Sequence, residues 1–258
     1  MEYLEGGRHQ QIIRHHQAVH RPMGAWSPAV HALLTHLRTV QFCAVPEVLG
    51  VDEQGREILS FLEGHVYNYP LPAIAASSEA LTSAATLLRT YHDATLSFVA
   101  QDISKLLWFF PAREPREVIC HGDYAPYNVV LQRQKAVGII DFDTAHPGPR
   151  VWDVAYALYR WAPLKNPQNP DGFGTVQQQV RRAHRFCDVY GVSPDERLAM
   201  IDVVLERLQV LVDFMMTEAA RGNETFQANI ADGHHLLYQQ DMDYLDTHRA
   251  VITEGLLA

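Results

Sequence analysis

The sequence predicts an α+β protein with a small, β-rich lobe followed by a larger, mainly helical lobe. In residues 1–64, short apolar runs alternate with turn-forming residues, which is the pattern of β-hairpins. In residues 65–258, long stretches repeat apolar residues at helical spacing, with a region of short strands among them. A chain of 258 residues is long enough for two such lobes. We therefore predict an N-terminal lobe over 1–64 and a C-terminal lobe over 65–258.

Short strands are expected at the start of the chain. Residues 3–9 resemble a strand followed by a turn. We expect the segments 11–14 and 17–20 to form two short paired strands.

A helix and a second hairpin complete the predicted N-terminal lobe. Ser27 can cap a helix that runs to Val40, and Pro28 suits its first turn. The apolar segments 45–51 and 57–62 flank a polar turn and therefore predict a hairpin.

The C-terminal lobe is expected to be helical outside its short strands. A segment rich in Pro, Asn and Gly, residues 163–174, predicts a loop. The predicted helices cover 80–92, 151–161, 175–190, 194–221 and 224–248.

The short strands of this lobe surround the most informative polar residues of the chain. An apolar run leads into His121-Gly122-Asp123, and Asn128 lies five residues after that aspartate. A second apolar run ends at Asp141. Since the segment between Asn128 and Asp141 reads as a hairpin, these two residues should lie close together at one end of it.

These residue types in this order suit the transfer of a phosphoryl group from a metal-bound nucleotide. One carboxylate can orient a substrate hydroxyl and accept its proton, while the asparagine carbonyl and the second carboxylate hold Mg²⁺. A kinase catalytic loop has the same order, His-x-Asp-x-x-x-x-Asn, followed by a metal-binding aspartate. The alternative is a buried hairpin whose polar residues only cap turns.

The motif His121-Gly122-Asp123-x-x-x-x-Asn128, with Ile-Asp141-Phe-Asp143 and Trp-Asp153 after it, resembles the aminoglycoside phosphotransferase family. This family also includes choline- and homoserine-kinase-like enzymes. The resemblance runs from about residue 4 to at least residue 164. It implies a protein-kinase-like two-lobed fold, Mg²⁺ as cofactor and ATP or GTP as co-substrate.

The resemblance also implies a role for each matching residue. Asp123 is the catalytic base, and Asn128 and Asp141 are the Mg²⁺ ligands. His121 is a structural residue of the loop, and Asp153 a structural acid that accepts hydrogen bonds from the catalytic-loop backbone.

Asp143 stands where the kinase motif has glycine. A second carboxylate here can contact the metal, directly or through water, or can cap the following turn. Both alternatives stay open.

The N-terminal lobe departs from the kinase pattern. Kinase-like enzymes hold the α- and β-phosphates with a strand lysine that pairs with a helix glutamate. The first lysine here is Lys105, and the helix predicted over 28–40 contains no glutamate. We therefore predict that this pair is lost as a unit and that Arg21 binds the phosphates, since guanidinium binds phosphate bidentately. The alternatives are Arg14, or an Arg21 that is simply an exposed strand end.

Two further segments are candidates for nucleotide contacts. Gly6 and Gly7 can form the phosphate-covering turn, since glycine lets backbone N–H groups approach an anion closely. A simple hairpin turn is the alternative. By resemblance, the segment 60–64 is the hinge between the lobes, so we assign adenine contacts to the backbone of Ser60, Phe61 and Leu62.

Composition and charge narrow the partners. A net charge of −9 argues against a nucleic-acid surface and mildly favours a cationic small molecule as acceptor. Carboxylates on the C-terminal helices would recognise amines if they faced the cleft; otherwise they form a solvated face. Those carboxylates are Asp213, Glu218, Asp232, Asp241, Asp243 and Asp246.

Targeting signals and cysteine pairing are not expected. No apolar run approaches the roughly 18 residues of a membrane span, and the N-terminus lacks the layout of a signal peptide. The widely spaced Cys43, Cys120 and Cys187 fit neither a disulfide framework nor a zinc site. We expect a cytoplasmic protein.

The sequence thus favours a Mg²⁺-dependent kinase that phosphorylates a hydroxyl of a small molecule, such as an aminoglycoside-like compound or an amino alcohol. A nucleotide-binding pseudokinase with a regulatory or scaffold role is the alternative, motivated by the missing lysine. A protein kinase is disfavoured because residues 145–152 leave no room for a long activation segment.

Overall fold

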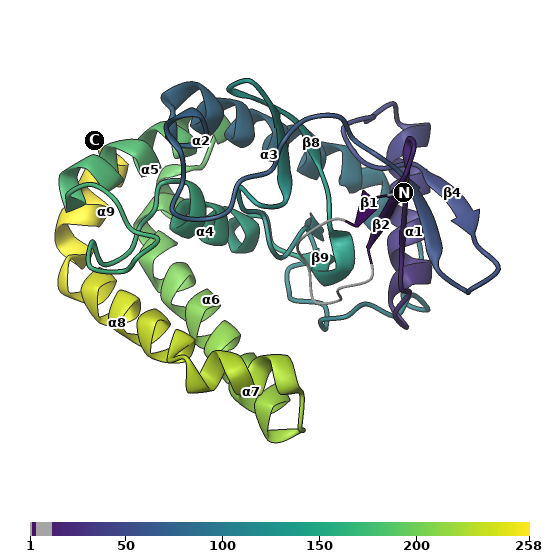
Figure 1. The fold of residues 1–258 in the computed structure, drawn as a ribbon. Helices are drawn as coiled ribbons and strands as arrows, with labels where there is room; N and C mark the ends of the chain where they lie inside the picture. Colours follow the sequence, from purple (N-terminus) through teal and green to yellow (C-terminus); the bar gives the residue numbers. More distant parts are fainter. Residues whose placement is uncertain (1, 4–11) are drawn as a thin grey trace. The chain divides into compact units, whose positions relative to one another are not determined.

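The computed structural model describes residues 2–3 and 12–258, and the chain divides into two compact units (Figure 1). Unit 1 comprises Met1–Val66 and Thr86–Arg150, and unit 2 comprises Tyr67–Ala85 and Val151–Ala258. The β-rich start and the helical remainder confirm the predicted α+β class. The short strands around the His121–Asp141 motif belong to the same unit as the N-terminal sheet, and the functional boundary at residue 64 stays a prediction.

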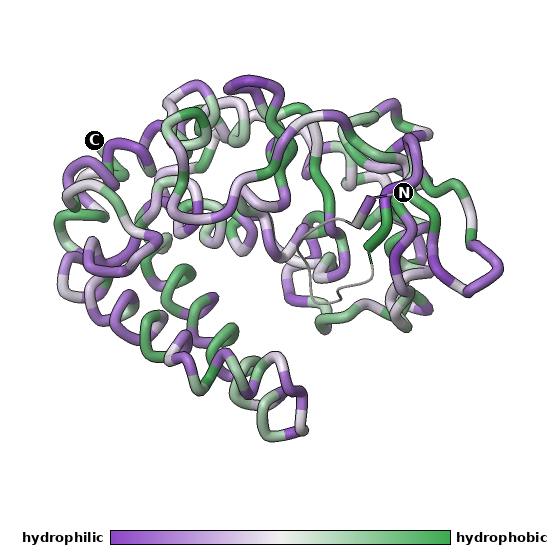
Figure 2. The backbone as a smooth tube through the Cα atoms, in the orientation of Figure 1, coloured by the Kyte–Doolittle hydropathy of each residue, from purple (hydrophilic) through white to green (hydrophobic). Residues whose placement is uncertain are grey.

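Unit 1 contains an antiparallel sheet with the strand order β1-β2-β3-β5-β4. Its register places Arg21 directly opposite Glu57, and residues that face each other in this way point to the same side of the sheet. The polar turn predicted between β4 and β5 is present, and Figure 2 shows that its tip is hydrophilic while a hydrophobic stretch of the strands lies next to it. The strands are β1 (Glu2–Tyr3), β2 (Ile13–His15), β3 (Ala18–Arg21), β4 (Val48–Val51) and β5 (Glu57–Ser60).

Helix α1 (Ser27–Thr39) follows β3, and its start differs from the prediction. Trp26 occupies the N-cap position without a side-chain cap. The hydroxyl of Ser27 instead accepts a hydrogen bond from the Gly24 N–H at 3.0 Å, so Ser27 closes the preceding turn and does not cap the helix. The predicted cap is therefore wrong, while the position of Pro28 in the first turn is confirmed. Leu33, Leu34 and Leu37 are buried on one face of the helix, as their spacing predicts.

Two short antiparallel pairs and a 3-10 turn complete the strands of unit 1. β6 (Val118–Cys120) pairs with β9 (His146–Gly148), and β7 (Val129–Gln132) pairs with β8 (Lys135–Ile139). The turn η1 (Phe142–Thr144) lies between β8 and β9. β6 is buried along its whole length, which fits a strand with an uninterrupted apolar sequence.

The helices that follow residue 65 agree with the prediction in position but not in number. The segment predicted as one helix over 224–248 breaks at Gly233, whose φ of +79° does not occur in a helix. The break yields two helices, of which α8 packs against α6 (Figure 1). Two helices, α2 and α9, were not predicted. The elements are α2 (Ala73–Ala76), α3 (Ser78–Val99), α4 (Arg150–Trp161), α5 (Val176–Tyr190), α6 (Pro194–Ala220), α7 (Glu224–Ala231), α8 (His234–Thr247) and α9 (Arg249–Leu257).

Within the described part of the chain, none of the helices has the length and apolar character needed to cross a bilayer. The cytoplasmic location stays a prediction.

Candidate active site

The catalytic-loop motif begins where β6 ends, and a buried histidine holds it. Nδ1 of His121 accepts the backbone N–H of Asp123 at 3.2 Å. Nε2 must then carry the proton that it donates to the carbonyl of Ile140, 2.9 Å away. His121 thus ties the loop to the end of β8, which fits the structural role that the resemblance implies.

Gly122 gives the loop its shape. Its φ is +82°, a conformation that other residues rarely adopt, and a Cβ at this position would overlap the carbonyl oxygen of Thr144. The Thr144 hydroxyl donates to the carbonyl of His121 at 3.0 Å, so η1 packs closely against the loop.

Two side chains hold the carboxylate of Asp123. The Tyr127 hydroxyl donates to Oδ1 at 2.7 Å, and Nδ2 of Asn128 donates to Oδ2 at 3.0 Å. Nδ2 of Asn128 also donates to the Asp123 carbonyl at 3.0 Å. Sequence reasoning missed Tyr127, because a tyrosine four residues after an aspartate carries no signal until the turn between them is known.

The hairpin places the two predicted metal ligands close together, as the sequence predicts. The Ile140 N–H donates to the Asn128 carbonyl at 2.9 Å, so Asn128 and Asp141 flank the same end of the β7–β8 pair. Since Nδ2 of Asn128 faces Asp123, Oδ1 is the end of the amide that can bind a cation. The Asp141 side chain keeps 39% of its surface exposed.

This donor set fits Mg²⁺. An amide oxygen and a carboxylate are hard oxygen ligands, and Mg²⁺ commonly takes one or two protein ligands and completes its shell with phosphates and water. The described residues hold no group of three or more His, Cys, Asp or Glu side chains arranged for a metal. A two-ligand site that needs the nucleotide phosphates is therefore the arrangement these residues support.

Arg21 lies among three carboxylates. Its Nε donates to Glu57 at 2.5 Å, Nη1 to Asp141 at 3.0 Å and Nη2 to Asp143 at 2.6 Å. The alternative of an exposed strand end is therefore wrong. The strand-lysine and helix-glutamate pair is absent from the sequence, as predicted, but Arg21 still has a glutamate partner, because Glu57 of β5 supplies the carboxylate.

The electrostatics of the cluster keep Arg21 charged. Burial alone would lower the pKa of its guanidinium, but Asp143, Asp141 and Glu57 together raise it above its ordinary value. The pKa of Asp143 is also raised: burial has the largest effect, and the negative Asp141 and Glu57 add to it against the attraction of Arg21. Asp143 thus pairs with Arg21, a role different from both that were predicted for it, and metal contact by Asp143 stays a prediction.

Arg14, the other candidate for phosphate binding, is engaged elsewhere in the sheet. It donates to Glu63 at 3.0 Å, and its guanidinium lies 3.5 Å from the centre of the Phe61 ring. Arg21, by contrast, contacts Asp141, the predicted metal ligand, and is therefore the better candidate.

Three further predictions concern the segment 60–64, the Gly6-Gly7 turn and Asp153. In the segment predicted as the hinge, the backbone N–H of Ser60 donates to the carbonyl of Glu47 and that of Phe61 to the carbonyl of Gln17. Adenine would therefore have to contact other backbone groups of the segment, such as those of Leu62. Gly6 and Gly7 lie outside the described residues. Asp153 is fully buried in the first turn of α4, and its anchoring role stays a prediction.

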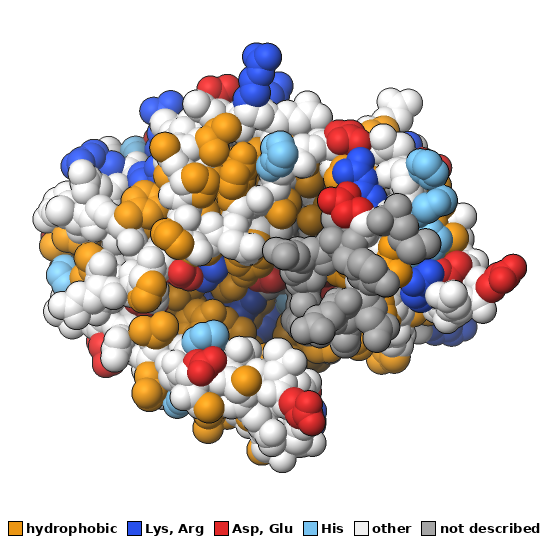
Figure 3. Space-filling view, viewed as in Figure 1, with side chains coloured by type: hydrophobic (Ala, Val, Ile, Leu, Met, Phe, Trp, Pro, Cys, Tyr) orange, Lys and Arg blue, Asp and Glu red, His pale blue; other side chains and the backbone are white. Residues whose placement is uncertain are grey.

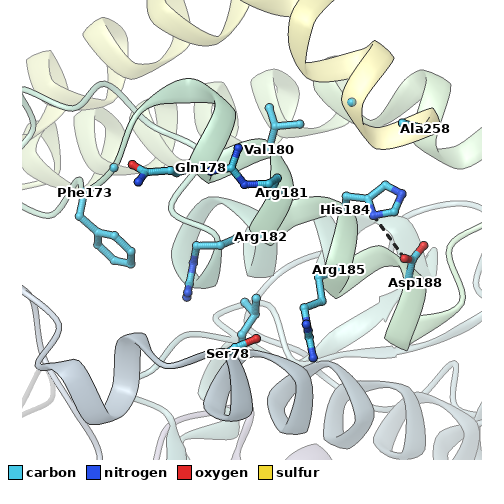
Figure 4. A pocket seen from close by; sticks show the side chains of 13 residues that line it. Ser78, Phe173, Gln178, Val180, Arg181, Arg182, His184, Arg185, Asp188 and Ala258 are labelled. Carbon is cyan, nitrogen blue, oxygen red and sulfur yellow. Dashed lines mark ion pairs between the residues drawn. The ribbon is translucent and has the colours of Figure 1, made fainter.

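Unit 2 contains a cavity of about 990 Å³ beside α5 and the start of α3 (Figure 4). Arg182 and Arg185 extend toward Ser78 in this view. Arg182 donates to the carbonyls of Ala76 at 2.7 Å and Trp161 at 2.8 Å, so it joins three segments of the unit. No predicted site residue that the structure describes lines this cavity.

The carboxylates proposed to recognise amines have different environments. Asp241 is fully buried and accepts hydrogen bonds from Tyr159, Asn166 and Asn169 at 2.7 to 2.8 Å, so it organises the 163–174 loop from within. Glu218 pairs with the exposed Arg221. On the face shown in Figure 3, acidic and basic side chains lie scattered among one another.

Sequence and structure comparisons agree with this geometry. The sequence model of the phosphotransferase enzyme family, APH, matches residues 97–187, which include the whole catalytic loop and hairpin. A trifolitoxin immunity protein from Rhizobium leguminosarum bv. trifolii is 34% identical over 208 residues, covering 78% of each chain. The chain belongs to the phosphotransferase enzyme family.

Solved structures confirm the predicted protein-kinase-like fold. A choline/ethanolamine kinase family protein from Mesorhizobium loti has a TM-score of 0.57 at 15% identity, with 95% of this chain and 88% of that chain covered. An amicoumacin kinase in complex with AMP-PNP and Ca²⁺ has a TM-score of 0.55 at 8% identity, with 86% and 88% covered. At these identities the likeness concerns the fold.

Proposed function

We propose that this chain is a Mg²⁺-dependent kinase that transfers the γ-phosphoryl group of ATP to a hydroxyl of a small molecule. One observation carries the proposal: hydrogen bonds join Asp123 to Asn128, Asn128 to Ile140, which directly precedes Asp141, and Asp141 to Arg21. A base, two oxygen ligands and a phosphate-binding cation are the parts that phosphoryl transfer requires.

Each residue has a defined task in this proposal. Asp123 accepts a hydrogen bond from the acceptor hydroxyl, orients its oxygen for attack and takes its proton. Tyr127 and Asn128 keep the carboxylate of Asp123 in place. When bound, Mg²⁺ neutralises charge on the phosphates, and Oδ1 of Asn128 and the carboxylate of Asp141 would hold it. Arg21 would contact the α- and β-phosphates.

The family model and the fold neighbours support this reading at the level of reaction class. The amicoumacin kinase was solved with AMP-PNP, which supports ATP as the nucleotide. The family of the Mesorhizobium loti protein supports an amino alcohol as acceptor, and the name of the 34% identical relative supports testing a hydroxyl-bearing toxin or antibiotic as well. The net charge of −9 is compatible with a cationic acceptor.

The scaffold alternative is less well supported. A chain that only binds nucleotide has no physical need for a base held by two hydrogen bonds, as Asp123 is.

The proposal is tested in two steps. First, ATP and GTP are added with Mg²⁺ or with EDTA, and the melting temperature is measured; ATP with Mg²⁺ should stabilise the protein, by about 2.7 kcal/mol at 100 times Kd. Second, ADP release is measured against amino alcohols, aminosugars and hydroxyl-bearing antibiotics. Absence of any nucleotide stabilisation would overturn the proposal. If the wild-type chain binds nucleotide but releases ADP no faster than Asp123→Asn with every acceptor, the scaffold role would be favoured.

A further inference from the structure

A buried glutamate in the sheet contacts two cationic or ionisable side chains from different elements. Glu57 of β5 is 1% exposed, and its Oε1 accepts from Nε of Arg21 in β3. Its other oxygen, Oε2, bonds to Nε2 of His31 in α1. One carboxylate therefore connects the sheet to the helix at the position of the phosphate-binding cation.

The way Arg21 divides its donors is suited to a ligand. A guanidinium has five N–H groups. Glu57 takes the single Nε–H, while Asp141 and Asp143 each take one N–H of a terminal nitrogen. Within the described part of the chain, this leaves one N–H on each terminal nitrogen for a further acceptor, and guanidinium N–H groups bind phosphate oxygens well.

Only Glu57 among the three carboxylates is removed from solvent. The Asp141 and Asp143 side chains are 39% and 27% exposed. Asp141 is also needed for the metal, so its bond to Arg21 must be shared when Mg²⁺ binds. A buried, hydrogen-bonded carboxylate is the partner that can hold the guanidinium in both situations.

We infer that Glu57 and His31 are positioning residues for nucleotide binding: Glu57 fixes Arg21 against the sheet, and His31 fixes Glu57 from α1. This inference rests on the proposed function. The arrangement replaces the strand-lysine and helix-glutamate pair with a strand-arginine and strand-glutamate pair, and the helix contributes a histidine. α1 also packs against β4 and η1, the turn that follows Asp141, so one helix supports the phosphate-binding side chain and the metal-binding loop.

The test compares ATP with adenosine, which lacks the phosphates. Glu57→Gln keeps the size of the side chain and removes its charge. We expect its Kd for ATP with Mg²⁺ to rise by about tenfold or more, as loss of a charged hydrogen bond would produce, while the Kd for adenosine stays within about twofold. Glu47→Gln is the matched control, because Glu47 belongs to the same lobe, is 53% exposed and pairs with Arg38; both affinities should be unchanged.

Two substitutions at His31, which is 18% exposed, test whether this side chain fixes Glu57. They also keep the inference testable if Glu57→Gln does not fold. His31→Leu removes the hydrogen bond and should weaken ATP but not adenosine. His31→Gln retains a donor at about the same distance and should restore ATP affinity. A purely structural role would lower both affinities together and would not distinguish the leucine from the glutamine variant.

The outcomes separate the two proposals. A wild-type chain that binds neither ATP nor adenosine would overturn the proposed function. A wild-type chain that binds ATP, with equal affinity in Glu57→Gln and His31→Leu, or with ATP and adenosine weakened in parallel, would overturn the positioning role alone.

Discussion

Three carboxylates around one guanidinium make Arg21 the side chain whose replacement should disturb the site most widely. Its Nε, Nη1 and Nη2 each contact a different acid, and the side chain is only 12% exposed. An ammonium group is compact and cannot reach three separated partners in this way, so Arg and Lys are not equivalent here.

We expect Arg21→Ala to weaken ATP binding by about 1.5–3 kcal/mol, the usual contribution of a charged hydrogen bond. The melting temperature should also fall, because the buried Glu57 would lose its cationic partner. Arg21→Lys should recover only part of both losses. Calorimetric titration and thermal unfolding measure the two effects, and an ATP affinity that does not change in Arg21→Ala would show that Arg21 does not contact the phosphates.

Asp123 allows a separate test of catalysis. Asp123→Asn keeps a side chain that can still interact with Tyr127 and Asn128 but removes the base, so turnover should fall by about 10²–10⁴-fold while the Kd for ATP stays nearly constant. ADP release at saturating ATP and acceptor measures the first quantity. Full activity of the variant would exclude Asp123 as the base.

At the scale of elements, backbone conformation shapes the loop of the predicted catalytic base and the turn at Asp141, the predicted metal ligand. Gly122 and Asp141 both have positive φ, +82° and +60°. At Gly122 there is no room for a Cβ. At Asp141 the residue is an aspartate, which adopts positive φ more readily than most residues. The positions of Asp123 and Asp141, the proposed base and metal ligand, therefore depend on two local turns as well as on the strands.

Gly122→Ala should destabilise the protein more than the conformational cost alone. Gly55 provides the control, because its φ of +74° is similar but no atom lies within 4 Å of its Cβ position. Gly55→Ala should cost about 1 kcal/mol from the unfavourable φ, while Gly122→Ala adds the overlap with Thr144 and should exceed it by about 1–3 kcal/mol. Urea denaturation measures both values; equal losses would show that the loop can move away from Thr144 without cost.

At the scale of the whole molecule, burial should control cysteine chemistry. Cys43 is exposed, whereas Cys120 and Cys187 are buried. Burial raises the pKa of the Cys187 thiol to about 12, so little thiolate forms at pH 8. Alkylation of the native protein at pH 8 should modify Cys43 alone, and mass spectrometry should detect modification of all three only after denaturation. Rapid native modification of Cys187 would mean that α5 opens readily.

The sequence alone determined the features that depend on short separations along the chain. The β7–β8 hairpin brings Asn128 and Asp141 to the same end because the residues between them form two strands and a turn. Helices α1, α4, α5 and α6 follow from apolar spacing and from local starts, such as the capping boxes at Thr175 and Ser193. The resemblance to the phosphotransferase family also rests on a short motif, His121-Gly122-Asp123-x-x-x-x-Asn128.

The tertiary structure alone decided the features that depend on which strands are neighbours. Glu57 and Arg21 are far apart in the sequence, and only the antiparallel register of β3 and β5 places them opposite each other. The contact of His31 with Glu57 requires, in addition, the way α1 lies on the sheet. A periodic pattern shows which face of a strand or helix is buried, but strand pairing and helix packing decide which polar side chains meet on it.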